Sequence, residues 1–175
     1  RRNEDPLDLA RQARVSASSQ QETGPAVAVQ SGQTRAVHGP GGAPPGRVAP
    51  GSHRWMSEPA AGFPATLQLE WKESIRPGRI ELIFDTALHR VLTFSLADGY
   101  TAKMAWGRPQ PETVRNYRIE RLADGGWQPL LQIRDNYQRR RVHEFPSAAY
   151  RALRVTVEST WGLDHGRIAE VRVYA

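Results

Sequence analysis

A stretch rich in aromatic and cationic residues offers the clearest binding chemistry in this 175-residue chain. Residues 98–110 contain Tyr100, Lys103, Trp106 and Arg108 among glycine and proline, which indicates a loop between strands. A sugar platform needs an aromatic ring for the apolar side of a pyranose, with donors beside it for the hydroxyls. We therefore predict that Tyr100, Trp106 and Arg108 contact carbohydrate. The alternative is that Trp106 packs over the edge of a sheet.

A second aromatic candidate lies in the turn before the last predicted strand. Trp161 falls within residues 159–166, where its ring would be exposed unless another loop covers it. We take Trp161 and His165 of this turn as further ligand-contact candidates, together with Asn136 from the polar run before residue 139. The remaining tryptophans are predicted to be structural: Trp55 and Trp71 as parts of the core or of its lid, and Trp127 as a core anchor.

Three consecutive arginines, Arg139, Arg140 and Arg141, form the densest cluster of charge. Guanidinium forks suit carboxylate or phosphate, so the cluster can be interpreted as an anion patch, for which an acidic polysaccharide is a more natural partner than DNA. Strand alternation would place Arg139 and Arg141 on one side and Arg140 on the other. That geometry favours a division between ion pairs and solvent.

Residues for catalysis are scarce. The chain has no cysteine, which excludes thiol nucleophiles, disulfides and cysteine zinc sites. Neither a serine elbow of the GxSxG type nor an HExxH motif is present. The acidic residues mostly alternate with apolar ones, as solvent-facing strand positions should. We therefore expect no catalytic residues and no enzyme activity of this domain on its own. The five histidines show no metal-ligand spacing: His38, His53, His89, His143 and His165.

The charge balance is basic but dispersed. The formal net charge is +6 with a sequence pI near 10.3, and Lys72 and Lys103 are the only lysines among 24 basic residues. The arginines are scattered through strand-like segments, so we do not expect a nucleic acid partner, although clustered cations would favour one. No stretch approaches the roughly 18 apolar residues of a membrane span, so no membrane partner is expected.

Alternating apolar and polar residues dominate from residue 65 onward. No segment carries a sustained apolar stripe at helical spacing, so the chain is predicted to be all-β, with about eight antiparallel strands in a sandwich or barrel. Residues 20–64 are predicted to be irregular. The strand candidates are residues 13–18, 66–71, 79–85, 91–96, 117–119, 127–133, 139–145, 153–157 and 171–173.

The order of these segments resembles a known family. Residues 15–20, 54–57, 67–71 and 80–85, followed by the 116–127 hairpin and the closing pair at 152–157 and 167–174, are similar to the discoidin or coagulation-factor type C domains, which are galactose-binding-like jelly rolls. The resemblance covers residues 13–175 and leaves residues 1–12 as a linker or N-terminal extension. A narrower resemblance, carried by residues 135–145, is to the C-terminal domain of bacterial FAD-dependent oxidoreductases, some of them xanthan-lyase-like.

The resemblance implies a binding module whose ligand lies in loops at one end of the sandwich. It also implies a structural calcium near Ser31, Thr34 and Glu170. Ser31, however, stands where the family has aspartate, and calcium takes six to eight oxygens with several carboxylates among them. The residues themselves thus argue against calcium, and no other cofactor is expected in this domain.

Together these features predict a non-catalytic accessory module of a larger bacterial enzyme that binds carbohydrate. The alternative is a structural domain that docks on the catalytic domain of its own chain, an FAD-dependent oxidoreductase. The sequence begins Arg1-Arg2-Asn3, which suggests a piece of a longer protein. The compartment is left open, with the periplasm or the exterior slightly favoured.

Overall fold

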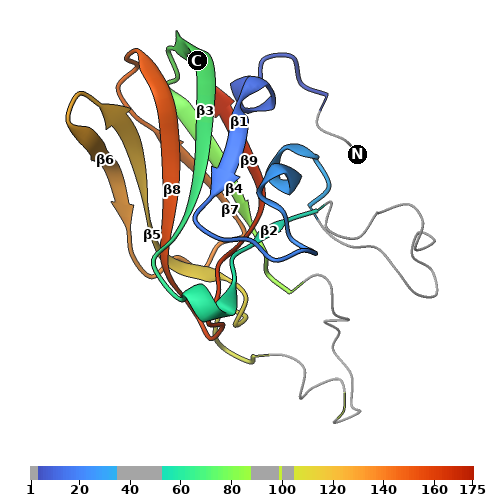
Figure 1. Cartoon of the computed structure of the whole chain (residues 1–175). Coiled ribbons are helices and arrows are strands. Elements are labelled where there is room, and N and C mark those ends of the chain that lie inside the picture. The colour runs from blue at the N-terminus through green and yellow to red at the C-terminus, as the bar shows by residue number, and fades with distance from the viewer. Residues whose placement is uncertain (1–3, 35–52, 88–98, 100–104) are drawn as a thin grey trace.

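Two antiparallel β-sheets packed face to face form the molecule (Figure 1). The computed structural model describes residues 4–34, 53–87, 99 and 105–175. Within them the predicted all-β class is confirmed, with nine strands against about eight expected, beside three short 3-10 turns. The strand predicted at residues 91–96 lies outside the described residues, as do Tyr100, Lys103, His38 and His89.

The larger sheet, called sheet A here, has five strands in the order β1-β3-β8-β5-β6. Its centre is β8, which pairs with β3 on one side and β5 on the other. Sheet A consists of β1 (Arg14–Ala17), β3 (Ala65–Ile75), β5 (Val114–Ala123), β6 (Gly126–Ile133) and β8 (Tyr150–Thr160).

The smaller sheet, sheet B, has four strands in the order β2-β9-β4-β7. Strand β2 has only two residues and joins the edge of β9 through Trp55 and Met56. Such a short strand carries no periodicity that a sequence could reveal. Sheet B consists of β2 (Trp55–Met56), β4 (Arg79–Phe84), β7 (Arg140–Glu144) and β9 (Arg167–Tyr174).

The core lies between the sheets and follows the predicted alternation. Leu67, Leu69 and Trp71 of β3 are buried, while Gln68 and Glu70 between them face outward. Each fully buried side chain of this size stabilises the fold by about 1.5–3 kcal/mol. Trp55 is also fully buried, so the structural roles predicted for Trp55 and Trp71 are confirmed.

Trp127 was predicted to anchor the core, and this is wrong. It is only half-buried and lies outside the core cluster, with the Arg154 guanidinium 4.3 Å from the centre of its ring. Trp127 pairs in register with Leu122 on β5, which is itself 40% exposed. An aromatic ring on an edge strand can therefore be covered by a guanidinium group instead of by the core.

The expectation that strand acids face solvent fails at two positions. Glu120 on β5 is 4% exposed and Glu170 on β9 is 1% exposed. Both lie on the outer faces of their sheets, but Arg118 and Arg154 contact Glu120, and Arg172 contacts Glu170 on β9, the strand against which residues 9–12 and 26–30 pack. Alternation predicts the face of a side chain and not what lies over that face.

Part of the segment predicted as a linker or extension packs on the sandwich. Residues Leu9–Gln12 form the 3-10 turn η1, whose N-cap is the buried Asp8. Oδ1 of Asp8 accepts hydrogen bonds from the backbone N–H groups of Ala10 and Val173, both at 2.9 Å. The Trp71 indole N–H donates to the carbonyl oxygen of Leu9 at 2.8 Å.

The longer connections leave the sandwich at one end, called the loop end here. Val114 at the start of β5 pairs with Thr160 at the end of β8, and Phe84 at the end of β4 pairs with Ile168 near the start of β9. The end of β1, the start of β3 and residues 85–87, 105–113, 134–139 and 161–166 therefore share this end, at the bottom of Figure 1. The opposite end, called the turn end, carries the short connections and the C-terminus.

Candidate ligand-binding loops

Trp106 and Arg108 lie at the exposed tip of a braced loop. The side-chain amide of Gln110 accepts from the backbone N–H of Ala105 and donates to its carbonyl oxygen, both at 3.2 Å. Gly107 at the tip has φ of +67°, which glycine adopts without strain. Trp106 is 49% exposed and Arg108 is exposed, so the loop presents an aromatic ring and a cation outward.

The base of this loop is tied to the turn that contains Trp161. The backbone N–H of Trp161 donates to the carbonyl oxygen of Thr113 at 3.1 Å, and that of Leu163 donates to Pro111 at 3.3 Å. The loop and the turn are thus held as neighbours by backbone hydrogen bonds, and two predicted site segments adjoin at the loop end.

Trp161 is half-buried and engaged on one face. Its indole N–H donates to the carbonyl oxygen of Asn136 at 2.7 Å, and the Arg115 guanidinium lies 4.6 Å from the ring centre. Arg115 is itself fixed by Asp135, at 2.7 Å. A sugar could stack on Trp161 only on the face away from Arg115, so the ring is less available than the sequence indicated.

Asn136 is 1% exposed and its amide is used within the protein. The Nδ2 group donates to the carbonyl oxygens of Val114 and Gln138, and Oδ1 accepts from the backbone N–H of Gln138. These bonds connect the 134–139 loop to the start of β5. The arrangement gives Asn136 a role in shaping the loop end and leaves little of it for a ligand.

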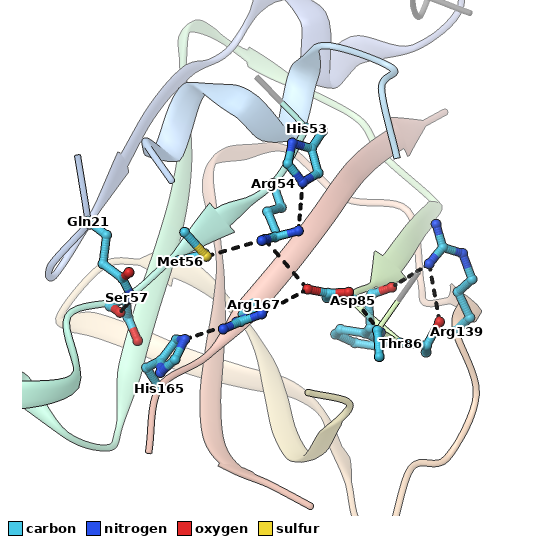
Figure 2. A network of polar contacts seen from close by, with 12 residues as sticks. Gln21, His53, Arg54, Met56, Ser57, Asp85, Thr86, Arg139, His165 and Arg167 are labelled. Atoms are coloured by element: carbon cyan, nitrogen blue, oxygen red, sulfur yellow. Dashed lines mark hydrogen bonds and ion pairs between the residues drawn. The ribbon is translucent and has the colours of Figure 1, made fainter. Parts of the chain in front are cut away.

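His165 belongs to a polar network at the start of β9 (Figure 2). Its Nδ1 lies 2.7 Å from Asp164 Oδ1, and its Nε2 accepts from Arg167 Nε at 2.9 Å. Both ring nitrogens are therefore engaged, and the residue is 7% exposed. His165 orients Arg167 and does not present a free donor to solvent.

Two guanidinium groups converge on one carboxylate in this network. Figure 2 shows Arg54 and Arg167 directed at Asp85, and their nitrogens lie 3.5 Å and 3.3 Å from its Oδ2. Asp85 follows the last residue of β4 and is 5% exposed. Burial lowers the pKa of Arg54, and the adjacent Asp85 carboxylate counteracts that effect. The network ties β2, β4 and β9 together beneath the loops.

The three arginines divide as alternation predicted, with Arg140 and Arg141 on β7 and Arg139 directly before it. Arg140 is exposed and pairs with Glu81 at 2.8 Å. Arg139 turns toward the loop end, where it donates to the carbonyl oxygen of Thr34 at 2.6 Å and to Phe84 at 3.3 Å. Arg141 reaches Asn136 Oδ1 at 3.4 Å. The side chains are thus committed to neighbours, and they do not form one continuous anion patch.

The three residues named for calcium do not fit that ion. The Ser31 hydroxyl accepts from the backbone N–H of Gln33, and the Thr34 carbonyl oxygen is occupied by Arg139. Glu170 accepts from Arg172 Nε at 2.8 Å, and burial raises the pKa of its carboxyl. In the part of the chain that the structure describes, no three histidine or acidic side chains gather in a metal-binding arrangement. Calcium needs several carboxylates, which this set lacks.

Sequence reasoning missed the central members of the network: Arg54, Asp85 and Arg167. The available signal was their position at strand ends that the topology brings together. No spacing along the chain could show it, because Arg54 and Arg167 are brought together only by the pairing of β2 with β9. Among the described residues no helix is long and apolar enough to cross a membrane.

Comparison with known proteins shows the fold. No family model matches the sequence, and no curated protein matches it. Among solved structures, a family 32 carbohydrate-binding module from C. perfringens NanJ, in complex with galactose, has a TM-score of 0.66 at 12% identity, covering 97% of this chain and 98% of that one. A chitosan-binding module from a chitosanase/glucanase of Paenibacillus sp. IK-5 has a TM-score of 0.62 at 15% identity, covering 96% of this chain and 98% of that one.

A third structure is the lectin domain of lectinolysin in complex with Lewis b antigen, with a TM-score of 0.59 at 16% identity and 97% of each chain covered. At identities this low, the structural similarity shows the fold of this chain and does not show its ligand. The nine described strands, their order in two antiparallel sheets and these neighbours together show that the chain has the galactose-binding-like β-sandwich fold.

Proposed function

We propose that this domain is a non-catalytic carbohydrate-binding module, an accessory part of a larger bacterial enzyme, which holds sugar at the loop end. The observation that carries the proposal is the braced tip at residues 105–110. A side chain held in place before binding loses less conformational entropy on contact with a ligand. Trp106 supplies the ring face and Arg108 supplies hydrogen-bond donors.

The known modules of this fold give the proposal its ligand class. The C. perfringens module was solved with galactose and the lectinolysin domain with a Lewis antigen. We infer a neutral or acidic saccharide as the ligand of this chain also. Tyr100 lies outside the described residues, and it stays a predicted contact, as do Trp161, His165 and Asn136, whose described hydrogen bonds also support the loops.

A glycan array followed by titration calorimetry tests the proposal. We expect heat with at least one sugar, and a loss of affinity of about tenfold or more in Trp106→Ala, since an aromatic contact contributes on the order of 1–2 kcal/mol. Trp127→Ala is the matched control, because Trp127 is a half-exposed tryptophan away from the loop end. No heat with any sugar, or equal affinities for the two variants, would reject the proposal.

Two rival functions, nucleic acid binding and hydrolysis, can be tested on the same purified domain. A nucleic acid ligand would show affinity that falls steeply with salt, since phosphate contacts release counterions. A flat dependence on salt excludes that rival. A hydrolase panel on the domain is expected to be blank, because the sequence has neither a GxSxG serine elbow nor an HExxH motif.

We further propose that the parent enzyme is an FAD-dependent oxidoreductase, on the narrower resemblance of residues 135–145. Much of that run has a structural role. Asn136 shapes a loop, and Arg139 donates to the carbonyl oxygen of Thr34. His143 is buried. Such residues indicate ancestry more than ligand. The coding sequence upstream of Arg1 tests the point: a flavin-binding domain there supports it, and a glycosidase there contradicts it.

A further inference from the structure

A polar groove at the turn end is separate from the loops described above. It has a volume of about 550 Å³ and lies between the end of β3, the β5–β6 turn and the start of β8. Its lining includes Ser74, Arg121, Asp124, Gln128 and Arg151. Volumes of this order accommodate a small ligand. In Figure 1 the β5–β6 hairpin turns at the end of the sandwich away from the loops.

The groove contains two guanidinium groups that have no carboxylate partner among the described residues. Arg121 donates to Gln128 Oε1 at 3.1 Å and lies 5.5 Å from the ring centre of Tyr150. Arg151 donates to the carbonyl oxygen of Lys72 at 3.3 Å. By contrast, Arg118 and Arg154 on the outer face of the same sheet each pair with Glu120.

These contacts position both cations without neutralising them. A ring and an amide hold Arg121, and a backbone carbonyl holds Arg151, so each guanidinium keeps its charge and further N–H donors. Guanidinium forks recognise carboxylate in a two-bond geometry. The groove therefore suits an anionic group of the carboxylate type.

The other side chains that line the groove restrict the class of ligand that fits it. Asp124 would repel a plain anion, but its carboxylate accepts hydrogen bonds from hydroxyls. The Gln128 amide and the Ser74 hydroxyl both donate and accept. A ligand that carries one carboxylate and several hydroxyls would use all of these groups. We propose that this groove binds a uronic acid, either as a free sugar acid or as a unit of an acidic polysaccharide.

An NMR titration of the labelled domain tests the proposal with three matched probes. D-galacturonate carries both features, galactose lacks the carboxylate and acetate lacks the hydroxyls. We expect galacturonate to shift amides at residues 121–128 and 149–151, with an affinity about tenfold or more above either other probe at this groove. Trigalacturonate distinguishes the sources, because tighter binding than the monomer indicates a polymer and equal binding indicates a free sugar acid.

Variants at Arg151 localise the effect. Arg151 is exposed, so Arg151→Gln should fold, and we expect its affinity for galacturonate to fall about tenfold or more, with Arg151→Lys intermediate because it keeps the charge but loses the fork. Arg14→Gln, an exposed arginine on β1, is the control. Unchanged binding in Arg151→Gln, equal binding of acetate, or shifts confined to residues 105–110 would overturn the proposal.

The outcome is independent of the proposed sugar site in the loops. Trp106→Ala should leave galacturonate binding at the groove unchanged, and Arg151→Gln should leave binding at the loop end unchanged. Failure at one end of the sandwich is thus distinguishable from failure at the other.

Discussion

Glu120 is a carboxylate on an outer sheet face that is nonetheless almost fully enclosed. Burial by itself would raise its pKa, but hydrogen bonds from Arg154, Thr156 and Arg118 outweigh burial and hold the pKa at about 2. Arg154 binds both oxygens, at 2.9 Å and 2.8 Å. The cluster joins β5 to β8 across the middle of sheet A.

Glu120→Gln should therefore destabilise the domain by about 2 kcal/mol, because it removes the carboxylate that Arg154 contacts through both oxygens, while Arg118 keeps its pair with Glu158. Denaturant unfolding measures this. Glu158→Gln is the matched control: Glu158 also pairs with Arg118 but is 26% exposed, so its loss should cost less than about 1 kcal/mol. Because the pKa of Glu120 is depressed in the folded state, its contribution is present above pH 4.5 and is lost as pH falls toward 2. Equal costs for the two variants would contradict this assignment.

His143 is a second residue with a shifted titration. Burial, and then the neighbouring Arg141 cation, lower its pKa from 6.5 to about 4. The Tyr117 hydroxyl lies 2.8 Å from its Nε2, which a neutral ring uses as an acceptor. In the unfolded chain the ring protonates near pH 6.5, so the fold has this contribution in full above pH 6.5 and loses it as pH falls to about 4.

We expect His143 to cause a fall in the free energy of unfolding of up to about 3 kcal/mol between pH 6.5 and 4. His143→Gln keeps a hydrogen-bonding group but does not titrate, so its stability should vary less over that range. An NMR titration of the His143 ring measures the pKa directly. A midpoint near 6.5 in the folded protein would contradict the prediction.

At the scale of elements, the N-terminal turn η1 behaves as part of the sandwich. Asp8 caps it and also accepts from the backbone of β9, so one carboxylate oxygen connects the turn to sheet B. The Trp71 indole N–H also binds this turn, because it donates a hydrogen bond to the carbonyl oxygen of Leu9. The turn thus packs along β9 beside the edge of sheet B.

Asp8→Ala should loosen this turn, because it leaves two backbone N–H groups without their acceptor, at a cost of about 2 kcal/mol. Hydrogen exchange at the Trp71 indole N–H should accelerate, while exchange on β5 and β8 changes less. Asp8→Asn keeps an oxygen acceptor and should lie between the wild type and Asp8→Ala. Unchanged exchange at Trp71 in Asp8→Ala would show that the turn is held by other contacts.

The strands show what could be predicted from the sequence and what could not. Strands β3 and β4 were visible because one face of each is apolar and buried, and period two follows directly from the pleat. Strand β2 was not visible because two residues have no period. The sequence could predict that the ligand-binding loops lie at one end of the sandwich. It could not predict the contacts of their side chains, because the partners come from segments far apart in the chain. Arg115 over Trp161 is one such pair, and Arg139 on Thr34 is another.

At the scale of the whole molecule, one guanidinium joins three segments where the family resemblance implied calcium. Arg139 of the β6–β7 connection reaches the carbonyl oxygen of Thr34, that of Phe84 at the end of β4, and the Thr86 hydroxyl. The protein's own cation thus holds the base of the loops. No resident ion is needed to connect these three segments.

The melting temperature should accordingly change by less than about 1 °C when calcium is added in millimolar excess or removed with a chelator. Arg139→Gln should lower it by about 4–8 °C, from a loss of about 2 kcal/mol, because hydrogen bonds to a charged group are lost. Arg140→Gln is the control, since its exposed pair with Glu81 contributes little. A calcium-dependent rise in melting temperature in the wild type would show that an ion site exists.

The contact between the two ends of the chain has a further consequence. The Tyr174 hydroxyl donates to the Asp5 carboxylate at 3.0 Å, so the beginning and the end of the described polypeptide meet at one point. The backbone is therefore nearly a closed ring. Circular permutation with a short joining peptide, or insertion of the whole domain into a surface turn of another protein, would require little rearrangement of the backbone. In either arrangement the Trp106 loop would still face away from the junction.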